Sequence, residues 1–296
     1  MRWHGALVSD KHRCPCWVFV ETHRQDVGIE PSLFCREFLL SNVFKRMENM
    51  LKRAAFLIVC LVCLVAGNAL AGEKVLINGI DANYPPFAYV DQSGKPSGFD
   101  VDAVNWIAAK MGFQVKHMPV DWDGIIPNLL AKKIDFICSG MTITPERAEK
   151  VNFTTPYWEV KNVFVTKKDS ALKAEEIYGK ELTVGMQAGT SEAKWMEEEK
   201  KKQGWKFEIR YYDSAAMAIE DVVNGRIDVA AMNYPPARDA EQKKPVRIIG
   251  IFGEVEPFGA AVRKDDKELL DKLNKGFELL KADPYWEELI AKHLNK

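Results

Sequence analysis

Short runs of apolar and β-branched residues alternate along residues 72–296 with longer segments in which apolar residues recur every three or four positions. Runs of the first kind are typical of buried strands, and the longer segments are typical of amphipathic helices. The expected strands are 75–80, 114–120, 134–138, 182–186, 206–212 and 246–251, and the expected helices are 99–111, 125–132, 214–223, 267–281 and 284–294, with a further one beginning at Ser191. This alternation predicts an α/β fold with largely parallel sheets.

One sequence pattern occurs twice, at 129–140 and at 222–233. Each copy has a helix end, a basic residue, Ile-Asp, a buried strand and then small or polar residues. The repetition favours two similar lobes over a single domain. Ligands of open α/β sheets collect beyond the carboxyl ends of the strands. We therefore expect Ser139 and Gly140 to face Asn233 across a ligand cleft between the lobes.

Two segments are expected to cross between the lobes. The run 162–165 leads into the second lobe and 257–262 leads back, so the helices at the C-terminal end should pack on the first lobe. Two crossings make a hinge. The predicted domains are lobe 1 at 72–160 plus 255–296 and lobe 2 at 161–254.

The first 71 residues differ from the rest and are typical of an export region. Basic residues within 45–53 precede an uninterrupted apolar run at 54–66, and small residues follow up to Ala71. This is the layout of a secretory signal peptide over 47–71 that is cleaved after Ala71, and it predicts a periplasmic protein.

Forty-six residues precede Met47, whereas signal peptides begin at the initiator methionine. We therefore expect residues 1–46 to be an upstream extension that is absent from the native protein, with the start at Met47 or Met50. The alternative is a short cytoplasmic extension on an uncleaved anchor.

The composition of 72–296 differs from that of the whole chain. The whole chain has 41 basic and 42 acidic residues, whereas 72–296 has about four more acidic than basic residues. Such an acidic excess supplies no affinity for nucleic acid. Five of the six cysteines lie before residue 72, so that only Cys138 remains, as an expected inert core thiol. No His/Cys cluster, phosphate-binding loop or GxSxG motif occurs, and neither a metal nor a cofactor is predicted.

Two predicted helix starts carry groups that suit a small carboxylate. Thr144 is an N-cap candidate, and Arg147 lies in the first turn, where its planar guanidinium could bind a carboxylate with two hydrogen bonds. Gly189, Thr190 and Ser191 form a turn and a helix start, with exposed N–H groups and two hydroxyls. A solvated arginine and simple capping are the alternatives. Together the two segments predict an anion held from both lobes.

Aromatic residues follow two of the strands predicted in the first lobe. Asp81 and Tyr84 come after 75–80, and Trp122 comes after 114–120. Aromatic faces beside a carboxylate suit a cationic or polar side chain. Buried packing is the alternative for Trp122.

Several motifs resemble those of the family 3 extracellular solute-binding proteins, the polar amino-acid receptors of ABC importers. The motifs are 81–87 (DANYPPF), 98–102 (GFDVD), 122–127 (WDGIIP), 139–147 (SGMTITPER), 153–157 (FTTPY) and 187–190 (QAGT). The resemblance covers 72–296 and implies a periplasmic-binding-protein-like fold, with two α/β lobes joined by a two-strand hinge and a ligand cleft between them. It implies a receptor rather than an enzyme, expected to be a monomer, that closes on an amino acid or amino-acid-like carboxylate and docks on an ABC permease in the inner membrane.

The candidate ligand-binding residues come from both predicted lobes. They are Asp81, Tyr84, Trp122, Ser139, Gly140, Thr142, Arg147, Gln187, Thr190, Ser191 and Asn233. The resemblance implies that Arg147 binds the α-carboxylate of the ligand, with support from Thr142 and Thr190.

The same resemblance implies how the rest of the ligand is held. Tyr84 and Trp122 would flank the side chain, and Asp81 and Gln187 would contact its polar end. Asn233 departs from the family, which usually has an Asp there for the α-ammonium. Either the ammonium relies on Asp81, or the amine of the ligand is modified or absent.

The alternative function is enzymatic. The same fold resembles the exported cyclohexadienyl dehydratases, which convert arogenate or prephenate into an aromatic acid and use a carboxylic acid in the cleft as proton donor. Glu192 is the only nearby candidate for that acid. An exposed Glu at a helix N-terminus is expected mainly to compensate the helix dipole.

Overall fold

The computed structural model of the protein describes residues 43–54, 56 and 75–294. The chain divides into two compact units, Met1–Gly72 and Glu73–Lys296. All the strands among the described residues, and the candidate site, lie in the second unit.

Most of the predicted export region lies outside the described residues. This holds for 1–42 of the predicted extension and for 55 and 57–71 of the predicted signal peptide. Residues 43–54 and 56 are helical and exposed. Among the residues that the structure describes, no helix combines the length and the apolar character needed to cross a membrane.

The first five-stranded sheet has the order β5-β1-β6-β13-β7. Its strands are β1 (Val75–Ile80), β5 (Gln114–Pro119), β6 (Phe136–Ile137), β7 (Val151–Phe153) and β13 (Ala261–Arg263). β1 is parallel to β5 and β6, whereas β13 is antiparallel to β6 and β7. A small antiparallel sheet accompanies it, formed by β2 (Asn83–Tyr84), β3 (Ala88–Val90) and β4 (Pro96–Ser97).

The second sheet has the order β10-β9-β11-β8-β12. Its strands are β8 (Trp158–Lys167), β9 (Thr183–Gln187), β10 (Glu208–Tyr212), β11 (Val229–Asn233) and β12 (Val246–Phe258). The strands β9, β10 and β11 are parallel, as predicted, and β8 is antiparallel to both β11 and β12.

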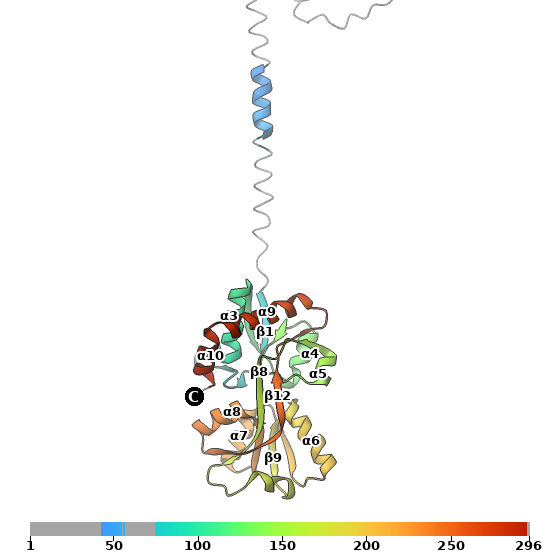
Figure 1. Ribbon diagram of the computed structural model, residues 1–296, viewed down its shortest axis with the longest axis vertical. Helices are drawn as coiled ribbons and strands as arrows, with labels where there is room; N and C mark the ends of the chain where they lie inside the picture. Colours follow the sequence, from blue (N-terminus) through green and yellow to red (C-terminus); the bar gives the residue numbers. More distant parts are fainter. Residues whose placement is uncertain (1–42, 55, 57–74, 295–296) are drawn as a thin grey trace, which may run out of the picture. The chain divides into compact units, whose positions relative to one another are not determined.

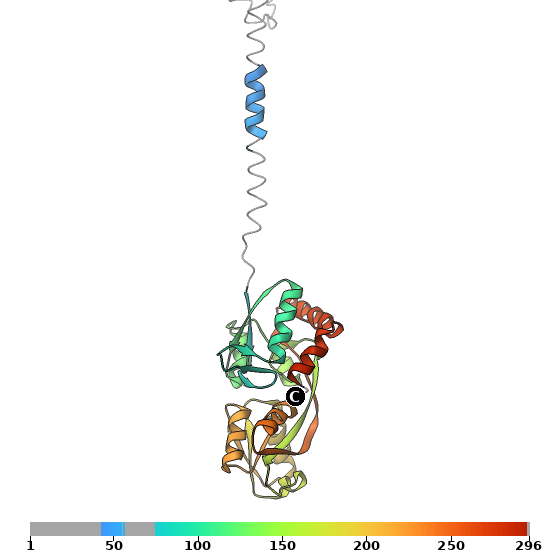
Figure 2. The ribbon, with the colours of Figure 1, turned by 90° about the vertical axis from the view of Figure 1, so that its left-hand side faces the viewer.

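The strands β8 and β12 run side by side between the two lobes (Figures 1 and 2). The predicted first crossing, 162–165, lies in β8. The prediction for the second crossing was wrong in one respect, because 246–251 and the start of 257–262 belong to one continuous strand, β12. Pairing with β8 continues through two register shifts, and this pairing extends the strand beyond its apolar run. The predicted lobe boundaries fall within these two strands.

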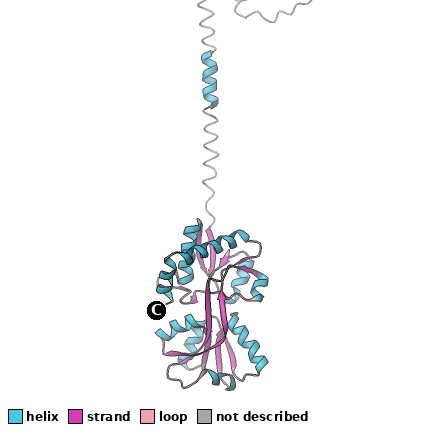
Figure 3. Ribbon diagram, in the orientation of Figure 1, coloured by secondary structure: helices cyan, strands magenta, loops and turns pink. Residues whose placement is uncertain are grey.

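Helices cover the faces of both large sheets (Figure 3). They are α3 (Phe99–Met111), α4 (Ile125–Leu130), α5 (Pro145–Lys150), α6 (Ser191–Gln203), α7 (Ala215–Asn224), α8 (Tyr234–Lys243), α9 (Lys267–Ala282) and α10 (Tyr285–His293), with two short 3-10 helices, η1 (Trp122–Gly124) and η2 (Ala174–Gly179). The sequence did not predict α8. Its first turn contains two prolines, which suit that position because they lack only N–H groups that a first turn leaves unpaired.

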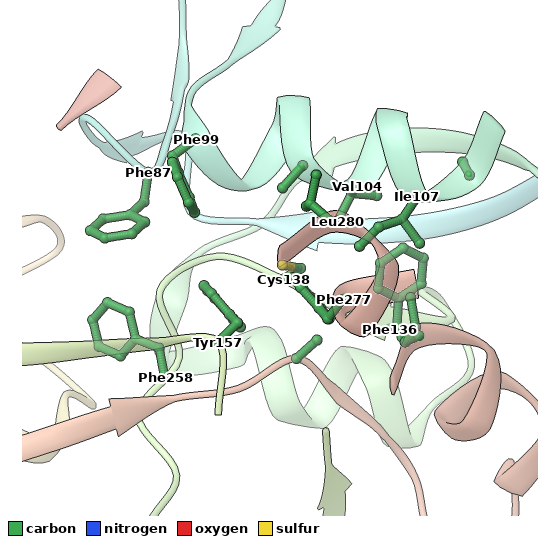
Figure 4. Close-up of a cluster of buried hydrophobic side chains, with 14 of the residues drawn as sticks. Phe87, Phe99, Val104, Ile107, Phe136, Cys138, Tyr157, Phe258, Phe277 and Leu280 are labelled. Atoms are coloured by element: carbon green, nitrogen blue, oxygen red, sulfur yellow. The ribbon is translucent and has the colours of Figure 1, made fainter. Parts of the chain in front are cut away.

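The C-terminal helices pack on the first lobe, as predicted. Phe99 and Val104 of α3 share a buried cluster with Phe277 and Leu280 of α9 (Figure 4). Cys138 lies in this cluster, fully buried, and burial raises the pKa of its thiol well above the usual value. These contacts agree with the expectation of an inert core thiol.

The second lobe buries both faces of its sheet. Val163 and Val165 of β8 pack in one cluster with Ile219 of α7, while Phe164 between them packs in another with Met196 of α6. This alternation follows from the two-residue period of a strand. It fixes the register of β8, and hence the direction of every side chain along the hinge.

Truncation of Phe277 tests the packing of α9 on the first lobe. Phe277 is 1% exposed, so we expect Phe277→Ala to lower the free energy of unfolding by about 3–5 kcal/mol. Leu279 of the same helix is 38% exposed and serves as the control, with an expected loss below about 1 kcal/mol for Leu279→Ala. Urea unfolding followed by circular dichroism measures both, and equal losses would contradict the described packing.

Candidate functional site

A small cavity lies between the two lobes. Its lining residues are Asp81, Tyr84, Trp122, Ser139, Gly140, Thr142, Arg147, Gln187, Thr190, Ser191, Glu192 and Asn233. The structure thus brings together all eleven candidate ligand-binding residues, and Glu192, the candidate acid of the enzymatic alternative, lies among them. Their role in ligand binding stays a prediction.

Strand ends position one part of this lining, as expected from the repeated pattern. Asp81 follows β1, while Gln187 and Asn233 are the last residues of β9 and β11. Ser139 follows β6, and its Oγ accepts a hydrogen bond of 2.9 Å from the backbone N–H of Asp81. Adjacent strand ends therefore hold one another in place.

Gly140 needs the conformation that only glycine adopts easily. Its φ is +59°, and a Cβ there would lie 2.5 Å from the ring of Tyr84. The backbone N–H of Gly140 donates to Asp100, which also accepts from the hydroxyl of Tyr157 at 2.9 Å. Burial raises the pKa of Asp100 to about 7, and these two hydrogen bonds oppose the rise.

Two helix N-termini supply the next part of the lining. The Thr144 hydroxyl accepts from the N–H of Arg147 at 3.2 Å, and the Thr190 hydroxyl accepts from the N–H of Ala193 at 3.3 Å. Thr144 is the N-cap that the sequence predicted, and Thr190 shows the capping that was the alternative for its segment. Capping and cavity lining are compatible at Thr190, because the same residue does both.

Arg147 is half-buried and reaches from one lobe to the other. Its Nη1 donates to the backbone oxygen of Thr142 at 2.9 Å, and its Nη2 donates to the backbone oxygen of Gly189 at 3.0 Å. The guanidinium also lies 5.5 Å from the ring centre of Trp122, within the range of a cation–π interaction. The alternative of a solvated surface arginine is therefore wrong.

Three further pairs join the lobes across the cleft. Gln187 Nε2 donates to Asp81 at 2.7 Å, and the Tyr84 hydroxyl donates to Asn233 at 2.5 Å. Lys194 of α6 forms an ion pair with Glu146 of α5. Most of these polar groups of the cavity therefore pair with one another, and an entering ligand has to replace some of these partners.

Sequence reasoning missed Glu256. Its Oε2 accepts from the hydroxyl of Thr142 at 3.2 Å and from that of Ser191 at 3.0 Å, so one carboxylate on β12 contacts residues of both lobes. The only signal for it was its position just before the predicted return crossing, and that position suggested no chemistry.

The environment of Glu192 was predicted wrongly. The expectation was an exposed carboxylate, whereas the residue is 6% exposed in the first turn of α6. Burial raises its pKa to about 7, and the charge of Glu256 raises it further, while Arg147 acts in the opposite direction. The first turn faces the other lobe, and only the tertiary structure determines that contact.

The site contains more acidic than basic side chains. Asp81, Glu192 and Glu256 are acidic, and burial raises the pKa of Asp81 as well. Arg147 is the one basic residue of the cavity lining. Asp81 and Glu192 are buried, and an excess of acidic over basic groups around such a site favours a ligand that carries positive charge.

Other features bear on what the site could hold. Among the described residues, no group of three His, Cys, Asp or Glu side chains is placed to hold a metal ion. The indole Nε1 of Trp122 is buried without a hydrogen-bond partner in the protein. It is a donor that a ligand could satisfy.

Comparison with known proteins gives consistent results. The sequence model of the bacterial extracellular solute-binding proteins, family 3, matches residues 76–296. ABC transporter arginine-binding protein 1 of Escherichia coli (strain K12) is 33% identical over 227 residues, which cover 75% of this chain and 90% of that protein.

Two solved structures are also similar to this chain. One is an ancestral arginine-binding protein bound to arginine, 36% identical, with a TM-score of 0.68 over 74% of this chain and 98% of that one. The other is an ancestral amino-acid-binding protein described as a precursor of cyclohexadienyl dehydratase, 36% identical, with a TM-score of 0.67 over 74% and 94%. The two-lobe α/β fold expected from the sequence is therefore confirmed.

Replacement of Glu192 tests its burial. Because its pKa rises on folding from 4.5 to about 7, the folded state binds more protons between these values, and stability falls as the pH rises through this range. Glu192→Gln removes this loss. We therefore expect the free energy of unfolding of the variant, relative to that of the unaltered protein, to be about 2–3 kcal/mol higher at pH 8 than at pH 4. Chemical denaturation at both pH values measures the gain.

Glu198 of the same helix, 67% exposed, provides the control. Glu198→Gln should leave the difference in the free energy of unfolding between pH 4 and pH 8 unchanged. If Glu192→Gln also left this difference unchanged, Glu192 would be solvated rather than buried.

Proposed function

The chain belongs to family 3 of the bacterial extracellular solute-binding proteins, and from this premise we propose that it is the amino-acid receptor of an ABC importer. The ligand binds between the open lobes, the lobes close about β8 and β12, and the closed form docks on a permease. The cavity between the lobes, lined by residues of both, supports this cycle. The sequence from 47 to 71 supports export to the periplasm.

The carboxylate of the ligand is proposed to bind at Arg147. Nη1 and Nη2 of its guanidinium now donate to backbone oxygens, those of Thr142 and Gly189. A carboxylate would accept both donors with full charge assistance. The N-terminus of α6, at Thr190 and Ser191, adds N–H groups and hydroxyls beside it.

We further propose a ligand with a cationic side chain. This ligand class is inferred from the excess of acidic over basic groups around the cavity. Once a ligand carboxylate neutralises Arg147, the carboxylates Asp81, Glu192 and Glu256 remain for two positive groups and one retained proton. The name of the Escherichia coli relative, an arginine-binding protein, agrees with this class.

The aromatic residues would bind the stem of such a side chain. Tyr84 and Trp122 are both buried and line the cavity. Asp81, now bound to Gln187, would exchange that partner for the cationic end. The α-ammonium is assigned to Asn233, whose oxygen has a second lone pair besides the one that Tyr84 uses.

A second candidate is a dehydratase acting on arogenate or prephenate. The observation that favours it is Glu192, a carboxyl in the cavity with a pKa of about 7, which suits a proton donor near neutral pH. The same carboxyl also fits the receptor, because it can be the one group that retains a proton when the ligand binds. The receptor is preferred because it uses Arg147 and the acidic excess together.

Thermal unfolding with added ligands tests the proposed class. At about 100 times its dissociation constant, a ligand adds about 2.7 kcal/mol of stability, which corresponds to a rise in Tm of about 5–10 °C for a protein of this size. We expect this rise with L-arginine, L-lysine or L-ornithine. L-Glutamine and L-glutamate are the neutral and acidic comparisons and should give less than half of it.

Two outcomes would contradict the proposal. A rise with L-glutamate equal to that with L-arginine would refute the cationic side chain. Turnover of prephenate that is lost in Glu192→Gln, without a rise for any amino acid, would establish the enzyme in place of the receptor.

Substitution of Arg147 tests the carboxylate site. Arg147→Gln removes the charge and the paired donors, so we expect the affinity for the ligand that gives the largest rise to fall at least about 100-fold. Arg147→Lys keeps the charge but not the planar pair of donors, and it should lose less. Lys150→Gln, at an exposed position of the same helix, is the control and should bind normally. Isothermal titration calorimetry measures all three, and unchanged affinity in Arg147→Gln would refute the assignment.

A further inference from the structure

Glu256 belongs with the first lobe, although it lies on a strand that connects the lobes. It pairs with Val160 of β8, and both Val160 and the nearby Phe258 lie in the buried cluster of the first lobe. Phe252 lies on the other side of a register shift in β12 and packs in a cluster of the second lobe. The shift separates the two parts of the strand, so we expect Glu256 to move with the first lobe.

The contact of Glu256 with Thr142 is held within that lobe. The backbone N–H of Ile143 donates to the backbone oxygen of Pro257 at 2.8 Å, and Thr142 forms a β-bridge with Phe258. The two neighbouring segments are therefore fixed side by side. Within this local pairing the hydroxyl of Thr142 donates to Oε2 of Glu256 at 3.2 Å.

The contact of Glu256 with Ser191 crosses the cleft. Ser191 is the first residue of α6 in the second lobe, and its hydroxyl donates to the same Oε2 at 3.0 Å. A carboxylate can only accept, and the positive end of the helix dipole favours a negative charge beside this first turn. Glu192 lies 3.3 Å from the same hydroxyl. Because burial raises its pKa to about 7, Glu192 can keep a proton and donate to the Ser191 oxygen, while the Ser191 hydroxyl donates to Glu256.

We propose that Glu256 is a positioning residue, which holds the first turn of α6 against the first lobe when the lobes close. Glu256 is not among the residues that line the cavity, so it acts on the ligand through Thr142 and Ser191, which are. The proposal rests on the proposed function in one respect, because it takes ligand binding to include closure. The bond to Ser191 exists only in the closed form. Its loss therefore speeds the opening of the lobes and the release of the ligand, while entry into the open cleft is unaffected.

Rates of binding test this role. Stopped-flow tryptophan fluorescence measures them, with the ligand that gives the largest rise in Tm. For Glu256→Leu, which has no acceptor, we expect dissociation to be about tenfold faster and association to change less than about threefold. Glu256→Gln keeps an acceptor without the charge and should lie between. Glu254→Leu, at an exposed position of the same strand, is the control and should leave both rates unchanged.

A double-mutant cycle tests the bond itself. Ser191→Ala removes the bond and keeps the charge of Glu256, so we expect dissociation to be about fivefold faster. In the Glu256→Leu background the bond is already absent, and adding Ser191→Ala should change the rate less than about twofold. An equal effect of Ser191→Ala in both backgrounds would show that Ser191 acts on the ligand alone, and would overturn the role of Glu256.

Hydrogen–deuterium exchange without added ligand separates this inference from the proposed function. Mass spectrometry of peptides covering 188–193 reports the opening of the first turn of α6. We expect exchange there to be at least about threefold faster in Glu256→Leu and in Ser191→Ala than in the unaltered protein or in Glu254→Leu. Unchanged exchange in Glu256→Leu would overturn the role of Glu256. Faster exchange in a protein that binds no amino acid would support this role and overturn the proposed function alone.

Discussion

The antiparallel pairing of β8 with β12 is the interaction on which the rest of the structure depends. These two strands belong to the sheet of the second lobe, and their ends lead into the first. Because they connect the lobes side by side, the carboxyl ends of β1, β6, β9 and β11 lie around one cavity. β12 also carries Glu256, so the connection also contributes to the chemistry of the site.

The closed cleft is held by polar groups that pair with each other. Arg147 reaches Gly189, Gln187 reaches Asp81, and Tyr84 reaches Asn233 across the lobes. Each is a bond that a ligand can replace with a stronger, charge-assisted one. The acidic excess means that a ligand gains most if it brings positive charge. In the proposed function, closure and selectivity would therefore depend on the same side chains.

Some residues of this protein both stabilise a local element and line the cavity. Thr190 caps α6 and lines the cavity, and Trp122 packs in a buried cluster while its ring lies beneath the Arg147 guanidinium. The predicted strand ends and helix starts located these residues because strand ends and helix N-termini are where unpaired backbone groups meet a cleft. The prediction of position succeeded for residues whose place depends on one element, and their role in ligand binding stays a prediction.

The sequence by itself determined the two lobes, most of the elements and the strand ends and helix starts that meet at the cavity, because hydrophobic period, caps and a repeated pattern can be followed along the chain. The family resemblance contributed further candidate residues, such as Thr142 and Gln187. Only the tertiary structure decided the burial of Glu192, the reach of Glu256 to both lobes, the continuity of β12 and the partner of Asn233. Each of these depends on which distant segment lies alongside, as Asn162 lies opposite Asn233 in the sheet. Burial, pKa and cross-strand contacts arise from pairs of segments far apart in the chain, and no period within one segment encodes them.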